Sequence, residues 1–282
     1  MSRHTLRNLL VVCLSFLFGS QLVRADELKY ALTAVASADG KSLFIADLNQ
    51  AGVWKLTDGK LSIFFQADKK FRTPLNRVRC IGIDRNGKLL AGDSSTREVF
   101  RFDDDDGKPQ PLTNGGIGIP MDLVVDPDNN IFVTDLELKW IWKIPAAGGK
   151  AEKFTEVDAP RGITMDADRN LWVINHGKNQ LLRITPDAKI EVVVEGRPWQ
   201  FPHEVELDKN KTAFVTDGYT KSVWKVPFGG KPEKLVSGEP LVNPVGLTWQ
   251  GDTLLVIDPR AKGVFAIDSA SKLSAVPGAT TK

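Results

Sequence analysis

The sequence repeats itself six times with a period near 42 residues, and no other feature constrains the fold as strongly. In each copy an apolar run ends in Asp or Asn, at residues 47, 93, 135, 175, 217 and 258, so successive ends lie 46, 42, 40, 42 and 41 residues apart. A fixed period of this length is typical of repeat architectures, in which one unit cannot bury its apolar face alone. We therefore interpret the chain as six copies of one structural unit.

Each unit contains four short runs rich in Val, Ile, Leu, Phe and Trp, separated by turn residues. In one copy the runs are ITMD (163–166), NLWVIN (170–175), QLLRI (180–184) and KIEVVV (189–194). The first runs of the other copies are TAVASA (33–38), IGID (81–84), LVVD (123–126), VELD (205–208) and LTWQ (247–250). None is long enough, or spaced at 3.6 residues, to predict a helix.

The first three runs of each unit are nearly continuous in apolar residues, as expected for a sheet that neighbours cover on both faces. The sequence therefore predicts an all-β protein, a six-bladed β-propeller with four antiparallel strands per blade. Two ways of closing the ring stay open. LKYAL (28–32) adds an outer strand to the last blade, or the C-terminal segment completes its own blade.

The first 25 residues have the pattern of a secretory signal peptide. Arg3 and Arg7 precede the apolar run LLVVCLSFLFG (9–19), and VRA (23–25) supplies a cleavage site before Asp26. We expect a mature chain of residues 26–282 that forms the propeller and is periplasmic or secreted. No later run of 18 apolar residues predicts a membrane span.

Charge and cysteine content narrow the function classes. The formal charge is +2, but removing the three arginines of residues 1–25 leaves 34 basic against 35 acidic residues, about −1. A near-neutral surface gives no electrostatic reason to expect a nucleic acid or an acidic membrane as partner. Cys80 is the single mature cysteine, so no intrachain disulfide can form. We expect a monomer.

The repeats resemble NHL repeats, whose pattern is Pro-x-Gly-aliphatic, then Asp, a turn, and an aliphatic run ending in Asp. Residues 160–184 (PRGITMDADRNLWVINHGKNQLLRI) carry it most clearly, and the resemblance extends over roughly residues 30 to 276. The chain also resembles the gluconolactonase and senescence-marker-protein family of metal-dependent hydrolases. It is similar, too, to the virginiamycin B lyase family, which typically has an acidic residue where Asn175 stands.

The gluconolactonase resemblance implies a divalent cation at the mouth of the central channel, held by residues at the start of the innermost strands. By repeat alignment those positions are Thr33, Arg79, Met121, Arg161, His203 and Val245. This ring lacks carboxylates, and its arginines would repel a divalent cation. The adjacent position supplies Asp122 and Glu204, which are the candidate ligands for Ca²⁺, Mg²⁺ or Zn²⁺.

Five residues are candidates for binding a ligand at the mouth. Arg79, Arg161 and His203 suit an anionic group, because guanidinium forks match carboxylate and phosphate oxygens. An alternative is that each arginine pairs with Asp122 or Glu204. The remaining candidates are Asp122 and Trp199, the latter because it precedes His203 in a segment that breaks the repeat. His203 and Glu204 are the candidate catalytic pair, since histidine titrates near neutral pH.

Other polar motifs are expected to be structural. Asn175 and the five equivalent aspartates can bond to their own hairpin backbone, so we expect no chemistry from Asn175 or His176. The run Asp103–Asp106 lacks the ligand spacing of an EF-hand. Trp54, Trp142 and Trp224 recur at one repeat position, which predicts packing between blades.

The sequence thus favours an exported binding module for a small anionic ligand or a protein partner at one face of the channel. The alternative is a metal-dependent gluconolactonase-like hydrolase of lactones or esters, or a virginiamycin B lyase-like enzyme, with a degenerate ligand set. No Gly-x-Ser-x-Gly nucleophile elbow or Gly-rich phosphate loop is present.

Overall fold

The computed structural model describes residues 27–68, 70, 72–102 and 107–280. The predicted signal peptide and the aspartates Asp103–Asp106 lie outside the described residues. Within these residues no helix is long and apolar enough to cross a membrane.

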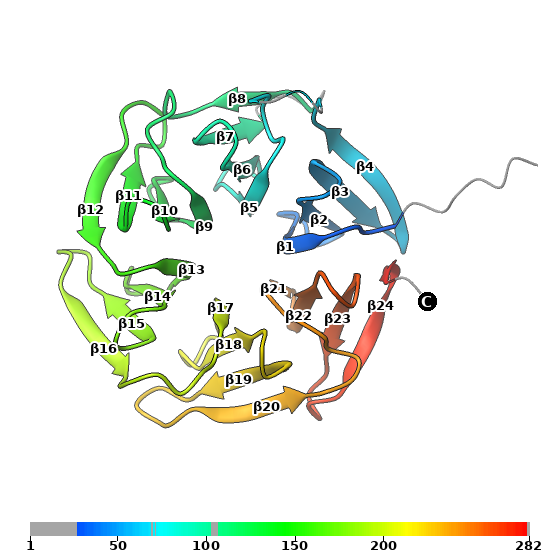
Figure 1. Ribbon diagram of the computed structural model, residues 1–282, viewed down its shortest axis with the longest axis vertical. Helices are drawn as coiled ribbons and strands as arrows, with labels where there is room; N and C mark the ends of the chain where they lie inside the picture. Colours follow the sequence, from blue (N-terminus) through cyan, green and yellow to red (C-terminus); the bar gives the residue numbers. More distant parts are fainter. Residues whose placement is uncertain (1–26, 69, 71, 103–106, 281–282) are drawn as a thin grey trace, which may run out of the picture.

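Six four-stranded antiparallel sheets form a ring around a central channel (Figure 1), which confirms the predicted six-bladed β-propeller. Blades 1 and 2 are β1 (Ala31–Ala36), β2 (Ser42–Asp47), β3 (Gly52–Thr57), β4 (Lys60–Gln66), β5 (Val78–Ile83), β6 (Leu89–Asp93), β7 (Glu98–Phe102) and β8 (Pro109–Pro111). Blades 3 and 4 are β9 (Pro120–Val125), β10 (Ile131–Asp135), β11 (Trp140–Ile144), β12 (Glu152–Glu156), β13 (Pro160–Met165), β14 (Leu171–Asn175), β15 (Leu181–Ile184) and β16 (Ile190–Val194). Blades 5 and 6 are β17 (Pro202–Leu207), β18 (Ala213–Asp217), β19 (Ser222–Val226), β20 (Glu233–Ser237), β21 (Gly246–Gln250), β22 (Thr253–Asp258), β23 (Gly263–Ile267) and β24 (Leu273–Thr280).

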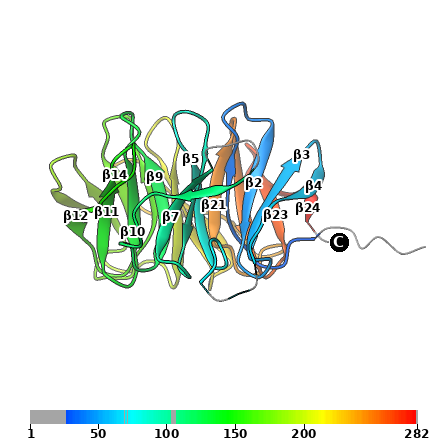
Figure 2. The same ribbon diagram turned by 90° about the horizontal axis from the view of Figure 1, so that it is seen from above.

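Each blade is built from one continuous stretch of chain, so no strand is exchanged between the two ends. The last sheet has the order β21-β22-β23-β24, and β1 is the innermost strand of blade 1. Of the two closures left open by the sequence, the C-terminal segment completes its own blade. Seen edge-on, the strands run roughly along the axis of the ring (Figure 2).

The core lies between blades rather than inside any one of them. Trp54 and Trp142 are buried at 2% and 8% exposure, each in a cluster that draws residues from two blades. Each indole also donates to the aspartate that ends the second strand of its blade, Asp47 or Asp135. The predicted packing role of the recurring tryptophans is confirmed for these two.

The repeated aspartates tie the chain together at the mouth of the channel. Asp135 is fully buried and accepts hydrogen bonds from the backbone N–H groups of Gly118 and Ile119, which lead into its blade, and of Glu137 and Leu138 in its own hairpin turn. These four bonds satisfy loop donors that would otherwise stay unpaired. The structural role expected of these residues is confirmed.

The innermost strands begin up to three residues earlier than the apolar runs predicted. β5 begins at Val78 instead of Ile81, and the pairing with β6 is irregular between Val78 and Cys80. Comparable irregularities recur in β1, β9, β13 and β17. Such bulges interrupt the alternation on which the prediction depended, and they redirect side chains at barrel and propeller rims.

Candidate functional site

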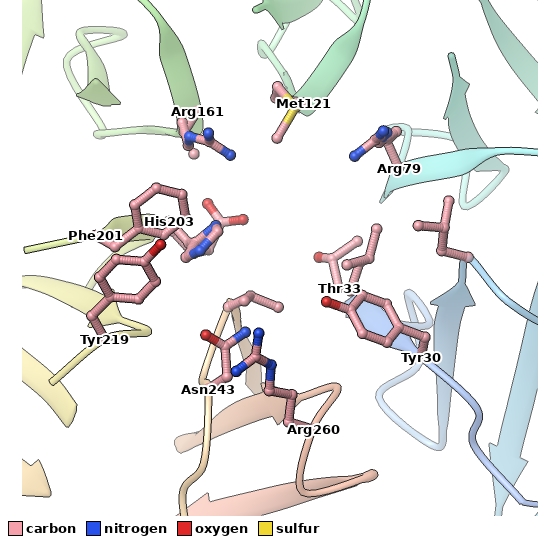
Figure 3. A pocket seen from close by; sticks show the side chains of 15 residues that line it. Tyr30, Thr33, Arg79, Met121, Arg161, Phe201, His203, Tyr219, Asn243 and Arg260 are labelled. Atoms are coloured by element: carbon pink, nitrogen blue, oxygen red, sulfur yellow. The ribbon is translucent and has the colours of Figure 1, made fainter. Parts of the chain in front are cut away.

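A pocket of about 320 Å³ occupies the mouth of the channel, at the end where the innermost strands begin. Its side chains come from all six blades and converge on the channel axis (Figure 3). Six of them occupy the equivalent position of each blade, at or beside the start of the innermost strand, namely Leu32, Arg79, Met121, Arg161, His203 and Val245. In blades 1 to 5 this position coincides with an irregularity in the strand pairing, whereas in blade 6 Val245 directly precedes the regularly paired β21.

The repeat alignment was wrong by one residue in blade 1. Ala31 pairs with Asp47, as Val78 pairs with Asp93 in blade 2, so the equivalent of Arg79 is Leu32 and not Thr33. Thr33 still lines the pocket, one position deeper. The error arose because the inner run of blade 1 is the least regular of the six, which left its register undetermined by sequence alone.

Three arginines line the pocket, and no carboxylate partner is found for any of them within the described residues. Arg79 donates from Nε to Ser94 Oγ (3.2 Å), and Arg161 lies over the ring of Phe201 at 5.0 Å, with a buried Nε that has no hydrogen-bond partner. Burial lowers the pKa of Arg79 and of Arg161, and the repulsion between neighbouring guanidinium groups adds to it. The third, Arg260, is exposed on the turn after β22. The predicted alternative of pairing with Asp122 or Glu204 is therefore wrong.

Aromatic side chains build one wall of the pocket. Phe201 stacks on Tyr219 with centroids 4.7 Å apart and planes 13° from parallel, and it meets both His176 and His203 edge-on at 4.7 Å. His176 does not line the pocket; its Nε2 lies 2.8 Å from the carbonyl oxygen of Pro202. It therefore supports the wall from behind, as the structural interpretation of the Asn175-His176 pair expected.

His203 is neutral at physiological pH. Burial, reinforced by the charge of Arg161, lowers its pKa to about 3. Its buried Nε2 has no hydrogen-bond partner in the described structure. An imidazole with a low pKa and a free ring nitrogen can accept or donate a hydrogen bond to a ligand, but it adds no positive charge.

Glu204 forms part of the pocket floor and shares a hydrogen bond with Asp122. The two carboxyl groups reach each other across the intervening blade because Gly162 on β13 has no side chain in the way. Burial raises the pKa of Glu204 well above its usual range and that of Asp122 to about 6. Asp122 accepts two backbone hydrogen bonds, from the N–H groups of Ile163 (2.8 Å) and Leu123. Glu204 accepts one, from Val205 (3.0 Å), so the shared proton is held by Glu204 and the negative charge by Asp122.

Below this floor the channel continues as a second cavity of about 200 Å³, lined by Asp122, Glu204 and Glu206 among others. Burial raises the pKa of Glu206 to about 8. Although three acidic residues line it, no group of three His, Cys, Asp or Glu side chains within the described ranges is arranged to hold a metal ion. The proposed ligands Asp122 and Glu204 point at each other instead of at a common site.

Two sequence candidates lie away from the pocket. Asp122 does not line it, because its carboxyl group lies beneath the floor. Trp199 is 2% exposed in the core between blades 4 and 5, packed with residues such as Trp172 and Val205. Its break from the repeat reflects this packing role, so the expected ligand contact is wrong. Arg79, Arg161, His203 and Glu204 line the pocket as predicted.

Sequence reasoning missed five polar or aromatic residues of the site. Tyr30, Phe201 and Asn243 all occur two residues before the ring position of their blade, and Tyr219 and Arg260 both occur two residues after the repeated aspartate. A signal was present, because both tyrosines of the whole chain fall at these two repeat positions. Recognising it required knowing that the two positions meet at one mouth.

Comparison with known proteins supports the fold. No protein-family model matches the chain, and no curated protein matches its sequence. Among solved structures, virginiamycin B lyase from Staphylococcus aureus is similar with a TM-score of 0.68 and 17% identity, over 89% of this chain and 87% of that chain. A gluconolactonase from Xanthomonas campestris gives 0.71 and 16%, over 89% and 88%. A chain of a nidogen–laminin complex gives 0.67 and 18%, over 86% and 91%. The chain thus shares its propeller fold with enzymes and with a component of a protein complex.

Proposed function

We propose that the protein is a binding module whose mouth pocket takes a small anionic ligand. The observation that carries this proposal is the set of three arginines around one pocket that have no carboxylate partner in the described part of the chain. A partly buried cation that lacks a counter-charge is costly, and a bound carboxylate or phosphate would relieve that cost through charge-assisted hydrogen bonds.

The floor of the pocket supports the same proposal. A carboxylate at the mouth would repel an anion, but burial, reinforced by the charge of Asp122 and the hydrogen bond to it, raises the pKa of Glu204 well above its usual range and keeps it protonated. Among the side chains that line the pocket, Glu204 is the single carboxyl group, so the three guanidinium groups face no ionised carboxylate there. The surplus of positive charge is what would draw an anion into the channel.

The test is calorimetric titration with a panel of small anions, namely acetate, benzoate, glutarate and inorganic phosphate, at low ionic strength. Replacing Arg79→Ala and Arg161→Ala together is expected to abolish binding of any anion that binds, with the melting temperature nearly unchanged. The matched control replaces Arg169→Ala and Arg183→Ala, whose partners are Asp128 and Glu191. Undiminished affinity in the first double variant would refute the proposal.

A hydrolase or lyase is the second candidate function, and one observation favours it. His203 and Glu204 are adjacent on β17 and both line the pocket, one unprotonated and one protonated. Such a pair has the protonation states of a general base and a general acid. Turnover of a lactone or ester by the wild type, lost in His203→Gln, would move the protein into this class.

A divalent cation does not fit the residues at the mouth. Asp122 and Glu204 are hydrogen-bonded to each other, and three arginines surround the position that a cation would take. The measurement is the metal content of the mature protein purified without chelator. About one Ca²⁺, Zn²⁺ or Mg²⁺ per chain, lost on Glu204→Gln or Asp122→Asn, would favour the metal-dependent hydrolase instead.

We also propose that the protein is exported and that a protein partner binds by presenting an acidic side chain to the same pocket. Export is tested by the mass of the mature chain, which is expected to begin at Asp26. A protein partner is expected to lose affinity in the Arg79→Ala, Arg161→Ala double variant and to compete with a small anion.

A further inference from the structure

Resting on the proposed function, we propose that the ligand is a compact polycarboxylate whose carboxylate groups bind separately to Arg79, Arg161 and Arg260. The three arginines come from alternate blades, on β5 of blade 2, on β13 of blade 4 and on the turn between β22 and β23 of blade 6. They form a triangle around the mouth (Figure 3).

The triangle argues for more than one anionic group. A carboxylate has two oxygens, and one guanidinium in the bidentate arrangement uses both. Guanidinium groups that enter from three separate sides of a pocket are therefore matched by a ligand with two or three carboxylates. Between the arginines lie neutral donors, including Asn243, Tyr30 and Tyr219, which suit hydroxyl groups on the same ligand.

Charge balance leads to the same ligand class. Arg79, Arg161 and Arg260 have no carboxylate partner within the described residues, and the carboxyl group that lines the pocket, that of Glu204, is protonated. A ligand of charge −2 or −3 would bring the pocket close to neutrality. Two other arginines on this face are already used: Arg97 pairs with Glu137, and Arg197 donates to backbone carbonyls.

The size of the pocket excludes a polymer threaded through the channel. Its volume of about 320 Å³ is at the lower end for ligand pockets, and Glu204 closes its floor. A compact molecule with carboxylates at its ends and centre fits these limits. A single multiply charged centre, such as phosphate, is the other source of the same charge.

The experiment is calorimetric titration of the mature protein with butyrate, glutarate, tricarballylate and inorganic phosphate. The first three carry one, two and three carboxylates on related short carbon chains. Affinity is expected to rise about tenfold per added carboxylate, the order of magnitude of one charge-assisted hydrogen-bonded pair. Arg260→Ala is expected to weaken tricarballylate binding about tenfold and butyrate binding by clearly less, so that the ratio of the two affinities falls. Arg197→Ala, on the same face, is the matched control and should change neither.

The outcomes separate this inference from the proposed function. Equal affinity for all three carboxylates, or an equal loss for all three in Arg260→Ala, would overturn the polycarboxylate assignment while anion binding itself stands. Tighter binding of phosphate than of tricarballylate would overturn it in favour of a single oxyanion. Absence of binding by all four probes would overturn both.

Discussion

The contact between Gly162 and the neighbouring blade offers the sharpest test of how the fold builds the site. Gly162 has a φ that any residue can adopt, so its backbone conformation permits alanine. The obstacle to alanine is that neighbouring atoms leave no room for a Cβ. A Cβ at this position would lie 2.6 Å from the Cα of Glu204, 2.9 Å from the carbonyl oxygen of His203, and closer still to the Glu204 carboxyl. Two of these three atoms belong to backbone, which cannot rotate away.

We therefore expect Gly162→Ala to destabilise the protein by about 3 kcal/mol, at the upper end for an overpacked site. For a propeller of this length that corresponds to a fall in melting temperature of roughly 6–12 °C. The Asp122–Glu204 hydrogen bond should be lost with it, because the carboxyl group of Glu204 has to move. The assay is urea and thermal unfolding of the variant and the wild type at pH 7.

Gly116→Ala is the matched control. Its Cβ would have no atom nearer than 3.9 Å, so its effect should stay within about 0.5 kcal/mol. The double variant Gly162→Ala, Glu204→Ala removes the side-chain obstacle but not the backbone ones, and we expect it to remain less stable than Glu204→Ala alone. A Gly162→Ala protein as stable as the wild type would refute the reasoning.

Three further predictions follow from the structure. Asp135→Ala should destabilise the protein by about 3 kcal/mol or more, because several buried backbone N–H groups lose their acceptor. Asp268→Ala, on an exposed turn, should destabilise it by less than half as much; both are measured by urea unfolding. Folding raises the pKa of Glu206 from 4.5 to about 8, so the native state keeps a proton that the unfolded state releases, and this carboxyl makes stability fall as pH rises between those values. Glu206→Gln should remove up to about 1.4 kcal/mol per pH unit of that slope, measured by urea unfolding at pH 5, 6.5 and 8; an unchanged slope would contradict the assignment. Trp199→Phe should leave anion affinity unchanged, since the indole lies in the core, and a large loss of affinity would return it to the site.

The number of blades was predictable because the same pattern of strands and turns occurs six times in the sequence. A single apolar run is ambiguous, but six copies of strand, turn and terminal Asp fix the period and the element type together. The structural role of Asp135 and its equivalents followed from the same repetition. The ring position was also predictable in blades 2 to 6, because the repeat alignment alone places Arg79, Arg161 and His203 at the mouth.

The two errors have different physical origins. Bulges at the start of the innermost strands change which residues face the channel, and apolar patterning does not reveal them. In blade 1 the inner run is also the least regular of the six, so the repeat alignment placed Thr33 where Leu32 stands. Trp199 was misplaced because a break in the repeat can serve packing as well as binding.

The sequence by itself determined the architecture, because strand periodicity and turn chemistry are local properties that each repeat encodes. Only the tertiary structure decided the character of the site, because that depends on side chains brought together from different blades. Arg260 joins Arg79 and Arg161 across the channel, and Glu204 meets Asp122 through the space left at Gly162. Whether a carboxyl keeps its proton, or an arginine lacks a partner, is fixed by such distant neighbours and by burial, neither of which the order of residues along the chain specifies.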